Sequence, residues 1–167
     1  RAMLGYVPQK GVLFTGDILS NLEFGGDVSE ADAIRAAATA QAEDFIWSRP
    51  HHFLTPVAQG GANVSGGQRQ RFSVAQALLQ KSDILLLDEA TAAMDISGKD
   101  CVWKSIRTLM AGKTVVYVAH DAQTLQNADW ILVLEHGTVT AAGDRQTVLQ
   151  QSAFCREMMD LKGGASA

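Results

Sequence analysis

The residue types best suited to chemistry lie in two short stretches, one shortly after the other. The first is Ser65-Gly66-Gly67-Gln68, and the second is Asp88-Glu89 at the end of an apolar run. A serine three residues before a glutamine is a capping-box pattern, so we expect a helix to begin at Ser65. The two glycines in its first turn are poor helix formers, which indicates that something approaches the backbone closely. Backbone N–H groups at a helix start bind anions, so a phosphate is the expected ligand.

The two carboxylates follow four consecutive aliphatic residues, Ile84-Leu85-Leu86-Leu87. A short apolar run without alternation predicts a strand that is buried on both faces, and therefore a parallel sheet. Asp88 and Glu89 then stand at the carboxyl end of that strand, where open α/β sheets bind their ligands. One carboxylate can hold Mg²⁺ through water, and the next can activate a nucleophile.

Composition indicates a folded protein. The 167 residues, 47% hydrophobic and 19% charged, suffice for one domain with a real core. The formal net charge of -4 and the lack of a Lys/Arg cluster argue against nucleic acid as the main partner. No apolar run approaches the ~18 residues of a membrane span, and the start shows no signal-peptide pattern. The sequence opens at Arg1 without an initiator methionine, so we expect a fragment of a larger protein.

Helices and short strands alternate around these two stretches. Segment 2–7 predicts a strand that ends at Pro8, with Gln9 just beyond it. The Ala-rich segment 33–42 follows acidic residues and predicts a helix. The adjacent His51 and His52 have no cysteine or carboxylate at ligand spacing, so we interpret them as solvated loop. Segments 130–134 and 138–142 predict a hairpin, with helices over 143–151 and 154–161.

A second apolar strand, Val115 to Ala119, ends in His120. We expect this strand to lie beside the 84–87 strand, which would put His120 on the same edge as Asp88-Glu89. The preceding Gly112-Lys113-Thr114 matches the end of the phosphate-binding pattern G-x-x-x-x-G-K-[ST]. Arg107 stands where that pattern needs its first glycine, and a strand follows instead of a helix. We therefore predict a helix-to-strand turn there.

In this order and spacing, the motifs resemble the nucleotide-binding domain of ABC transporters of the exporter type, over nearly the whole chain. The resemblance implies an α/β fold, namely a partial P-loop NTPase core whose parallel sheet is flanked by helices, with an α-helical subdomain inserted before the signature motif. It assigns 1–24 to the Q-loop strand and loop of the core. Residues 25–82 would form the α-helical subdomain ending in the signature helix, and 83–167 the C-terminal part of the ATPase core.

The resemblance also implies a role for each motif residue. Glu89 would be the catalytic base, and His120 the switch histidine that contacts the γ-phosphate. Asp88, which ends the Walker B strand, and Gln9 of the Q-loop would serve Mg²⁺, mostly through water. The other residues implied to bind ATP belong to the signature motif and the D-loop: Ser65, Gly66, Gly67, Gln68 and Asp95.

The implied function is ATP hydrolysis that drives export across a membrane. Two such domains would close head to tail over two ATP molecules, so that each site combines one protomer's core with the signature helix of the other. The implied partners are a second nucleotide-binding domain and a fused or associated transmembrane domain, at the cytoplasmic face of the inner (plasma) membrane. The Walker A loop and the adenine-stacking aromatic residue should precede Gln9 and are not in this sequence, so we expect the fragment alone to be inactive.

Two other functions stay open. One is a non-hydrolysing module that donates its signature motif to a partner's ATP site, against which the intact Glu89 and His120 argue. The other is a soluble ABC-type ATPase that acts on nucleic acid or ribosomes. The exporter-like segment Phe14-Thr15-Gly16 and the lack of a basic cluster disfavour it.

Overall fold

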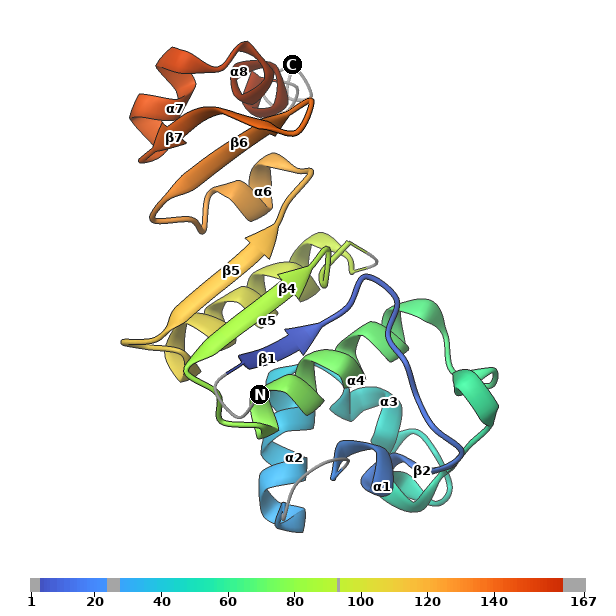
Figure 1. Cartoon of the computed structure of the whole chain (residues 1–167). Helices are drawn as coiled ribbons and strands as arrows, with labels where there is room; N and C mark the ends of the chain where they lie inside the picture. The colour runs from blue at the N-terminus through green and yellow to red at the C-terminus, as the bar shows by residue number, and fades with distance from the viewer. Residues whose placement is uncertain (1–3, 24–27, 93, 161–167) are drawn as a thin grey trace. The chain divides into compact units, whose positions relative to one another are not determined.

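The structure of the chain is a computed structural model that describes residues 4–23, 28–92 and 94–160. It divides into two compact units, residues 1–118 and residues 119–167 (Figure 1). The subdomain boundary expected after residue 24 lies outside the described residues. The division into 1–24, 25–82 and 83–167 stays a prediction.

A three-stranded parallel sheet forms the centre of the first unit. Its strands lie in the order β1 (Leu4–Val7), β4 (Ile84–Asp88) and β5 (Thr114–Val118). In the register of the sheet, Asp88 pairs with Val118. The parallel pairing predicted from the apolar runs is confirmed, and it brings the carboxyl ends of the three strands to one edge.

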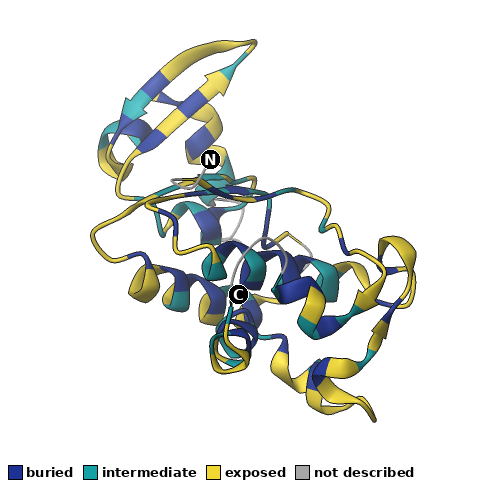
Figure 2. Cartoon of the chain, turned by 60° about the horizontal axis from the view of Figure 1, so that its bottom comes forward, coloured by how far each residue is buried: buried dark blue, intermediate teal, exposed yellow. Residues whose placement is uncertain are grey.

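The two faces of this sheet differ in burial, so the prediction of a strand buried on both faces is wrong. Leu85 and Leu87 are each 1% exposed, whereas Ile84 is 36% and Val116 is 49% exposed (Figure 2). Helices α4 (Gly66–Leu79) and α5 (Ile96–Leu109) belong to the same core cluster as Leu85 and Leu87. Because side chains alternate along a strand, helices on one face leave every second residue open.

Short elements surround α4 in the first unit. The predicted Ala-rich helix is confirmed as α2, Glu30–Thr39, although it ends at Thr39 and not at Ala42; its buried alanines pack against α4. The remaining elements are β2 (Gly16–Asp17), α1 (Ile18–Leu22), α3 (Glu43–Trp47), a 3-10 helix (His52–Leu54), β3 (Pro56–Val57) and a second 3-10 helix (Gln59–Gly61). Strands β2 and β3 pair antiparallel, and His51 and His52 are exposed.

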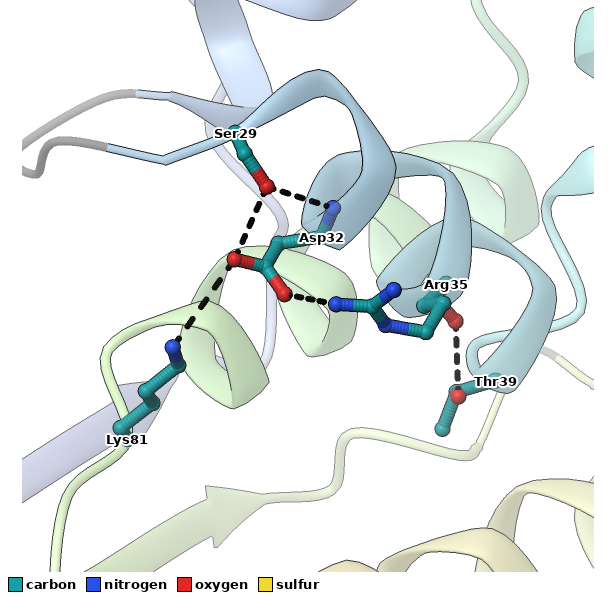
Figure 3. Close-up of polar contacts among 5 residues, drawn as sticks. All are labelled: Ser29, Asp32, Arg35, Thr39 and Lys81. Carbon is teal, nitrogen blue, oxygen red and sulfur yellow. Dashed lines mark hydrogen bonds and ion pairs between the residues drawn. The ribbon is translucent and has the colours of Figure 1, made fainter.

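A polar cluster holds the start of α2 (Figure 3). Ser29 accepts a hydrogen bond from the Asp32 N–H at 3.2 Å, and its hydroxyl lies 3.0 Å from Asp32 Oδ2 as donor. The guanidinium of Arg35 donates to the carboxylate of Asp32. Lys81, which follows α4, has its Nζ 3.9 Å from Asp32 Oδ2. The hydrogen bond from Ser29, followed by that from Arg35, lowers the pKa of Asp32. The cluster thus ties the start of α2 to the end of α4.

The predicted turn at Gly112-Lys113-Thr114 is confirmed as the link between α5 and β5. Gly112 has a φ of 76°, a backbone conformation that glycine adopts without strain. Lys113 Nζ donates to the Ser82 carbonyl oxygen at 2.9 Å, on the loop before β4. The ammonium group of Lys113 therefore links this turn to the loop before β4.

The second unit is built on the predicted hairpin, which is confirmed. Strands β6 (Ile131–Glu135) and β7 (Thr138–Gly143) pair antiparallel across the turn His136-Gly137. Buried and exposed residues alternate along β6, whereas the first three residues of β7 are all exposed (Figure 2). The helices of the unit are α6 (Ala122–Leu125), α7 (Arg145–Gln151) and α8 (Ala153–Asp160). Across the described residues of both units, no helix combines the length and apolar character that a membrane crossing requires.

Candidate functional site

The carboxyl ends of β1 and β4 bring three of the predicted site residues together. Gln9, two residues beyond β1, donates from Nε2 to Glu89 Oε2 at 2.9 Å. The Tyr6 hydroxyl lies 3.5 Å from Asp88 Oδ2, at the outer limit of a hydrogen bond. The amide of Gln9 and the carboxylates of Asp88 and Glu89 therefore share one edge of the sheet.

Glu89 has an unusual backbone. Its φ is 49°, in the left-handed region that costs a residue with a side chain about 1–2 kcal/mol. Its carbonyl oxygen accepts hydrogen bonds from the Ala92 N–H at 3.0 Å and from Gln70 Nε2 at 2.9 Å. A strained residue of this kind persists where its surroundings hold it, and such residues cluster at functional sites.

The start of α4 has the geometry predicted from the sequence. Ser65 Oγ accepts from the Gln68 N–H at 3.3 Å, and Gln68 Oε1 accepts from the Ser65 N–H at 2.9 Å, which completes the capping box. A Cβ added at Gly66 would lie 3.9 Å from its nearest neighbour, Arg69 Nη2. Packing within the chain therefore does not require glycine at this position.

The residues that follow tie α4 to several other segments. The guanidinium of Arg69 donates to the Gly61 carbonyl oxygen at 3.1 Å, and that of Arg71 donates to the Gln41 carbonyl oxygen at 2.8 Å. Arg71 Nη2 also lies 3.7 Å from Oδ1 of Asp95, the residue that precedes α5. The hydroxyl of Ser97 contributes most to lowering the pKa of Asp95. The predicted D-loop residue is thus linked to the predicted signature helix.

His120 belongs to the second unit. It is exposed and comes two residues after β5, the strand that pairs with β4 as predicted. Its place on the edge that carries Asp88 and Glu89 stays a prediction.

Gln70 is a candidate that the sequence did not single out. It is 4% exposed, and its Nε2 donates to the carbonyl oxygens of both Glu89 and Gln9, at 2.9 and 3.3 Å. Helical spacing puts residue 70 on the same line of α4 as the buried Val74 and Ala77. A glutamine on a buried line needs hydrogen-bond partners, and that signal could have pointed to it.

The ABC transporter family model matches residues 1–92, which is more than half of the chain. The chain belongs to the ABC transporter family. An ATP-dependent lipid A-core flippase of Saccharophagus degradans is 39% identical over 153 residues, which cover 91% of this chain and 26% of the flippase. ATP-binding cassette sub-family B member 10, mitochondrial, of Mus musculus is 38% identical over 165 residues, covering 96% of this chain and 23% of that protein.

A solved structure shows the same fold. The structure of a bacterial Atm1-family ABC exporter with ATP bound matches with a TM-score of 0.90 and 35% identity. The match covers 100% of this chain and 29% of the exporter chain. The predicted fold class, an α/β core with a parallel sheet flanked by helices, is confirmed, as is the similarity to ABC exporters. The chain spans about a quarter of the length of the curated relatives it matches.

Proposed function

We propose that this chain is part of the ATP-hydrolysing domain of an ABC exporter and couples ATP hydrolysis to transport across a membrane. The observation that carries the proposal is the cluster of Gln9, Asp88 and Glu89 at the carboxyl edge of the sheet. Phosphoryl transfer depends mostly on positioning and charge stabilisation, and this edge offers both a carboxylate base and oxygen ligands for a cation.

The carboxylate of Glu89 would orient and polarise the attacking water, and His120 of the second unit would contact the γ-phosphate. Glu89 and Gln9 are hydrogen-bonded to each other at 2.9 Å. This bond uses the amide nitrogen of Gln9 and one carboxylate oxygen of Glu89, so it does not involve the amide oxygen that would serve Mg²⁺.

The donor set fits Mg²⁺, which prefers hard oxygen ligands and keeps several waters. Asp88 supplies carboxylate oxygens at the end of β4, and Gln9 supplies an amide oxygen from the adjacent loop. When bound, the ion would neutralise charge that develops on the phosphates. Asp88 and Gln9 would hold it mostly through water.

The start of α4 would contribute to a second ATP site, in a head-to-tail dimer of such domains. The capping box uses the N–H groups of Ser65 and Gln68, so the phosphate would take those of Gly66 and Gly67. The space beside Gly66 is open, which supports a ligand there. Asp95, linked to Arg71, would stand at the same dimer interface.

The partners of the whole protein are a second nucleotide-binding domain, as a homodimer or heterodimer, and a fused or associated transmembrane domain at the cytoplasmic face of the membrane. The relatives described as exporters and flippases support this part of the proposal. The 167 residues hold no Walker A sequence, so we propose that they do not hydrolyse ATP alone. Micromolar ATP binding by residues 1–167 in calorimetry would contradict that statement.

The test is Glu89→Gln in the whole protein. Loss of a general base lowers rates about 10²–10⁴-fold, so ATP turnover should fall at least ~100-fold while ATP stays bound. The matched control is Glu157→Gln, the same change at an exposed position of α8, which should hydrolyse ATP at the wild-type rate. Unchanged turnover in Glu89→Gln would refute the assignment. A wild-type protein that binds but never hydrolyses ATP would favour a module that only donates its signature motif.

A further inference from the structure

A buried glutamine joins three segments at the carboxyl edge of the sheet. Gln70 lies in the second turn of α4, and one amide nitrogen donates to the carbonyl oxygens of Glu89 at 2.9 Å and Gln9 at 3.3 Å. A primary amide carries two N–H donors, enough for both bonds. Since the side chain of Gln9 in turn donates to the side chain of Glu89, the three residues form a closed set of contacts.

The bond to Glu89 falls at one of the described non-glycine residues whose backbone is in the left-handed region. Glu89 has a φ of 49°, and its carbonyl oxygen accepts from Gln70 as well as from the Ala92 N–H. A carbonyl oxygen has two lone pairs, and these two bonds use both. They constrain the peptide group that follows Glu89 and help to keep its backbone in the left-handed conformation, while the carboxylate itself accepts from Gln9 Nε2.

We infer that Gln70 is a positioning residue that holds the carboxylate of Glu89 and the loop of Gln9 in place and links both to the helix that begins at Ser65. The inference rests on the proposed function, because it takes Glu89 as the base. Small displacements of a catalytic group lower rates steeply, by about 10²-fold for 1 Å. Loss of the amide would therefore act on the catalytic step more than on ATP affinity.

The test replaces Gln70 with methionine in the whole protein, which keeps an unbranched side chain of similar length and removes both donors. The matched control is Gln76→Met on the same helix. Gln76 Nε2 donates to the Asn21 carbonyl oxygen at 2.8 Å, so the control also loses an amide-to-backbone bond, but one directed at α1. Steady-state ATP hydrolysis gives kcat and KM, and hydrogen–deuterium exchange reports on segments 8–11 and 89–92.

We expect Gln70→Met to lower kcat about 10- to 100-fold, with KM within about threefold of wild type. Exchange in 8–11 and 89–92 should become about 10-fold faster, as expected when part-buried carbonyl groups lose their hydrogen-bond partners. Gln76→Met should leave kcat and both segments unchanged and affect segment 18–23 instead. If Gln70→Met fails to fold, Gln70→Asn keeps an amide that is one methylene too short and should give the same pattern.

A kcat within twofold of wild type, or equal effects of the Gln70 and Gln76 variants on kcat, would overturn the inference. Faster exchange spread evenly over all of α4, with no excess in 8–11 and 89–92, would overturn it as well. The exchange measurement does not depend on turnover. If the wild-type protein does not hydrolyse ATP, the proposed function fails, while exchange still decides whether Gln70 holds these two segments.

Discussion

Gly11 of the Gln9 loop packs directly against α4, and replacing it with alanine tests this packing. A Cβ at residue 11 would lie 2.5 Å from the Arg69 carbonyl oxygen, 2.7 Å from its carbonyl carbon and 2.8 Å from Ser73 Oγ. Real Cβ contacts essentially never fall below 3.0 Å, and two of these atoms are helix backbone that cannot rotate away. The loop or the helix must shift by several tenths of an ångström, and such overpacking costs about 1–3 kcal/mol.

Hydrogen–deuterium exchange of the whole protein measures this cost locally, because the free energy of local opening sets the exchange rate. A loss of ~1–3 kcal/mol corresponds to roughly 5- to 150-fold faster exchange in the segments around Gly11 and Arg69. The control is Gly66→Ala, whose Cβ would be 3.9 Å from its nearest neighbour. It should leave α4 unchanged or stabilise it, because alanine is the better helix former by about 1 kcal/mol.

Exchange within twofold of wild type in Gly11→Ala would refute the close packing of the loop on α4. Faster exchange of α4 in Gly66→Ala would contradict the open space beside that residue. The control separates two effects, because Gly66→Ala is still expected to lose ATP turnover if Gly66 meets a phosphate.

Two further changes test the parts that support the site. Ser29→Ala removes the cap of α2, so the free energy of opening of that helix, measured by hydrogen exchange, should fall by about 1 kcal/mol. The variant also lacks the hydroxyl that donates to Asp32, so NMR titration should show a higher pKa for Asp32 than in the wild type. Because the pKa of Asp32 is lowered in the folded protein, its contribution to stability is present above the ordinary value of 3.8 and is lost as the pH falls through the lowered pKa. The stability of the Ser29→Ala variant should therefore change less between pH 3.8 and the lowered pKa of Asp32. An unchanged pKa of Asp32 in the variant would count against the role of Ser29. Leu85→Ala leaves a cavity at a core position that is 1% exposed, so it should destabilise β4 by about 2–5 kcal/mol. A hydrogen-exchange rate of β4 within twofold of wild type would contradict the burial of Leu85.

The elements of the site could be predicted because their signals are local. The capping box joins Ser65 and Gln68, three residues apart, and the aliphatic run before Asp88 forms β4 as expected. The hairpin of the second unit follows from two short β-prone runs on either side of a glycine turn. In each case the pattern that predicts the element lies within a few residues of the sequence, even where the element's hydrogen bonds are made with distant strands, as in β4.

The contacts of the site could be predicted only in part. The family resemblance assigns Gln9 and Asp88 to one magnesium site, but the bond between Gln9 and Glu89 joins residues 80 apart in the chain and follows from no local pattern. Helical spacing alone could indicate that Gln70 is buried and needs partners, but not which partners, because backbone carbonyl groups leave no mark in residue types. The exposure of one face of the sheet could not be predicted, because an apolar run does not indicate whether helices cover one face of a strand or both.

Local sequence patterns suffice for the order of the elements, the helix that Ser65 caps, the strand that ends in Asp88 and the chemical groups present there. Tertiary packing sets which of these groups contact one another and which face of β4 is buried, and it places the Gln70 amide of α4 where it donates to the Glu89 carbonyl oxygen. This difference follows from the separation along the chain over which each kind of interaction acts. Capping and periodicity act over a few residues, whereas side-chain bonds to distant backbone depend on how helices and strands pack in space.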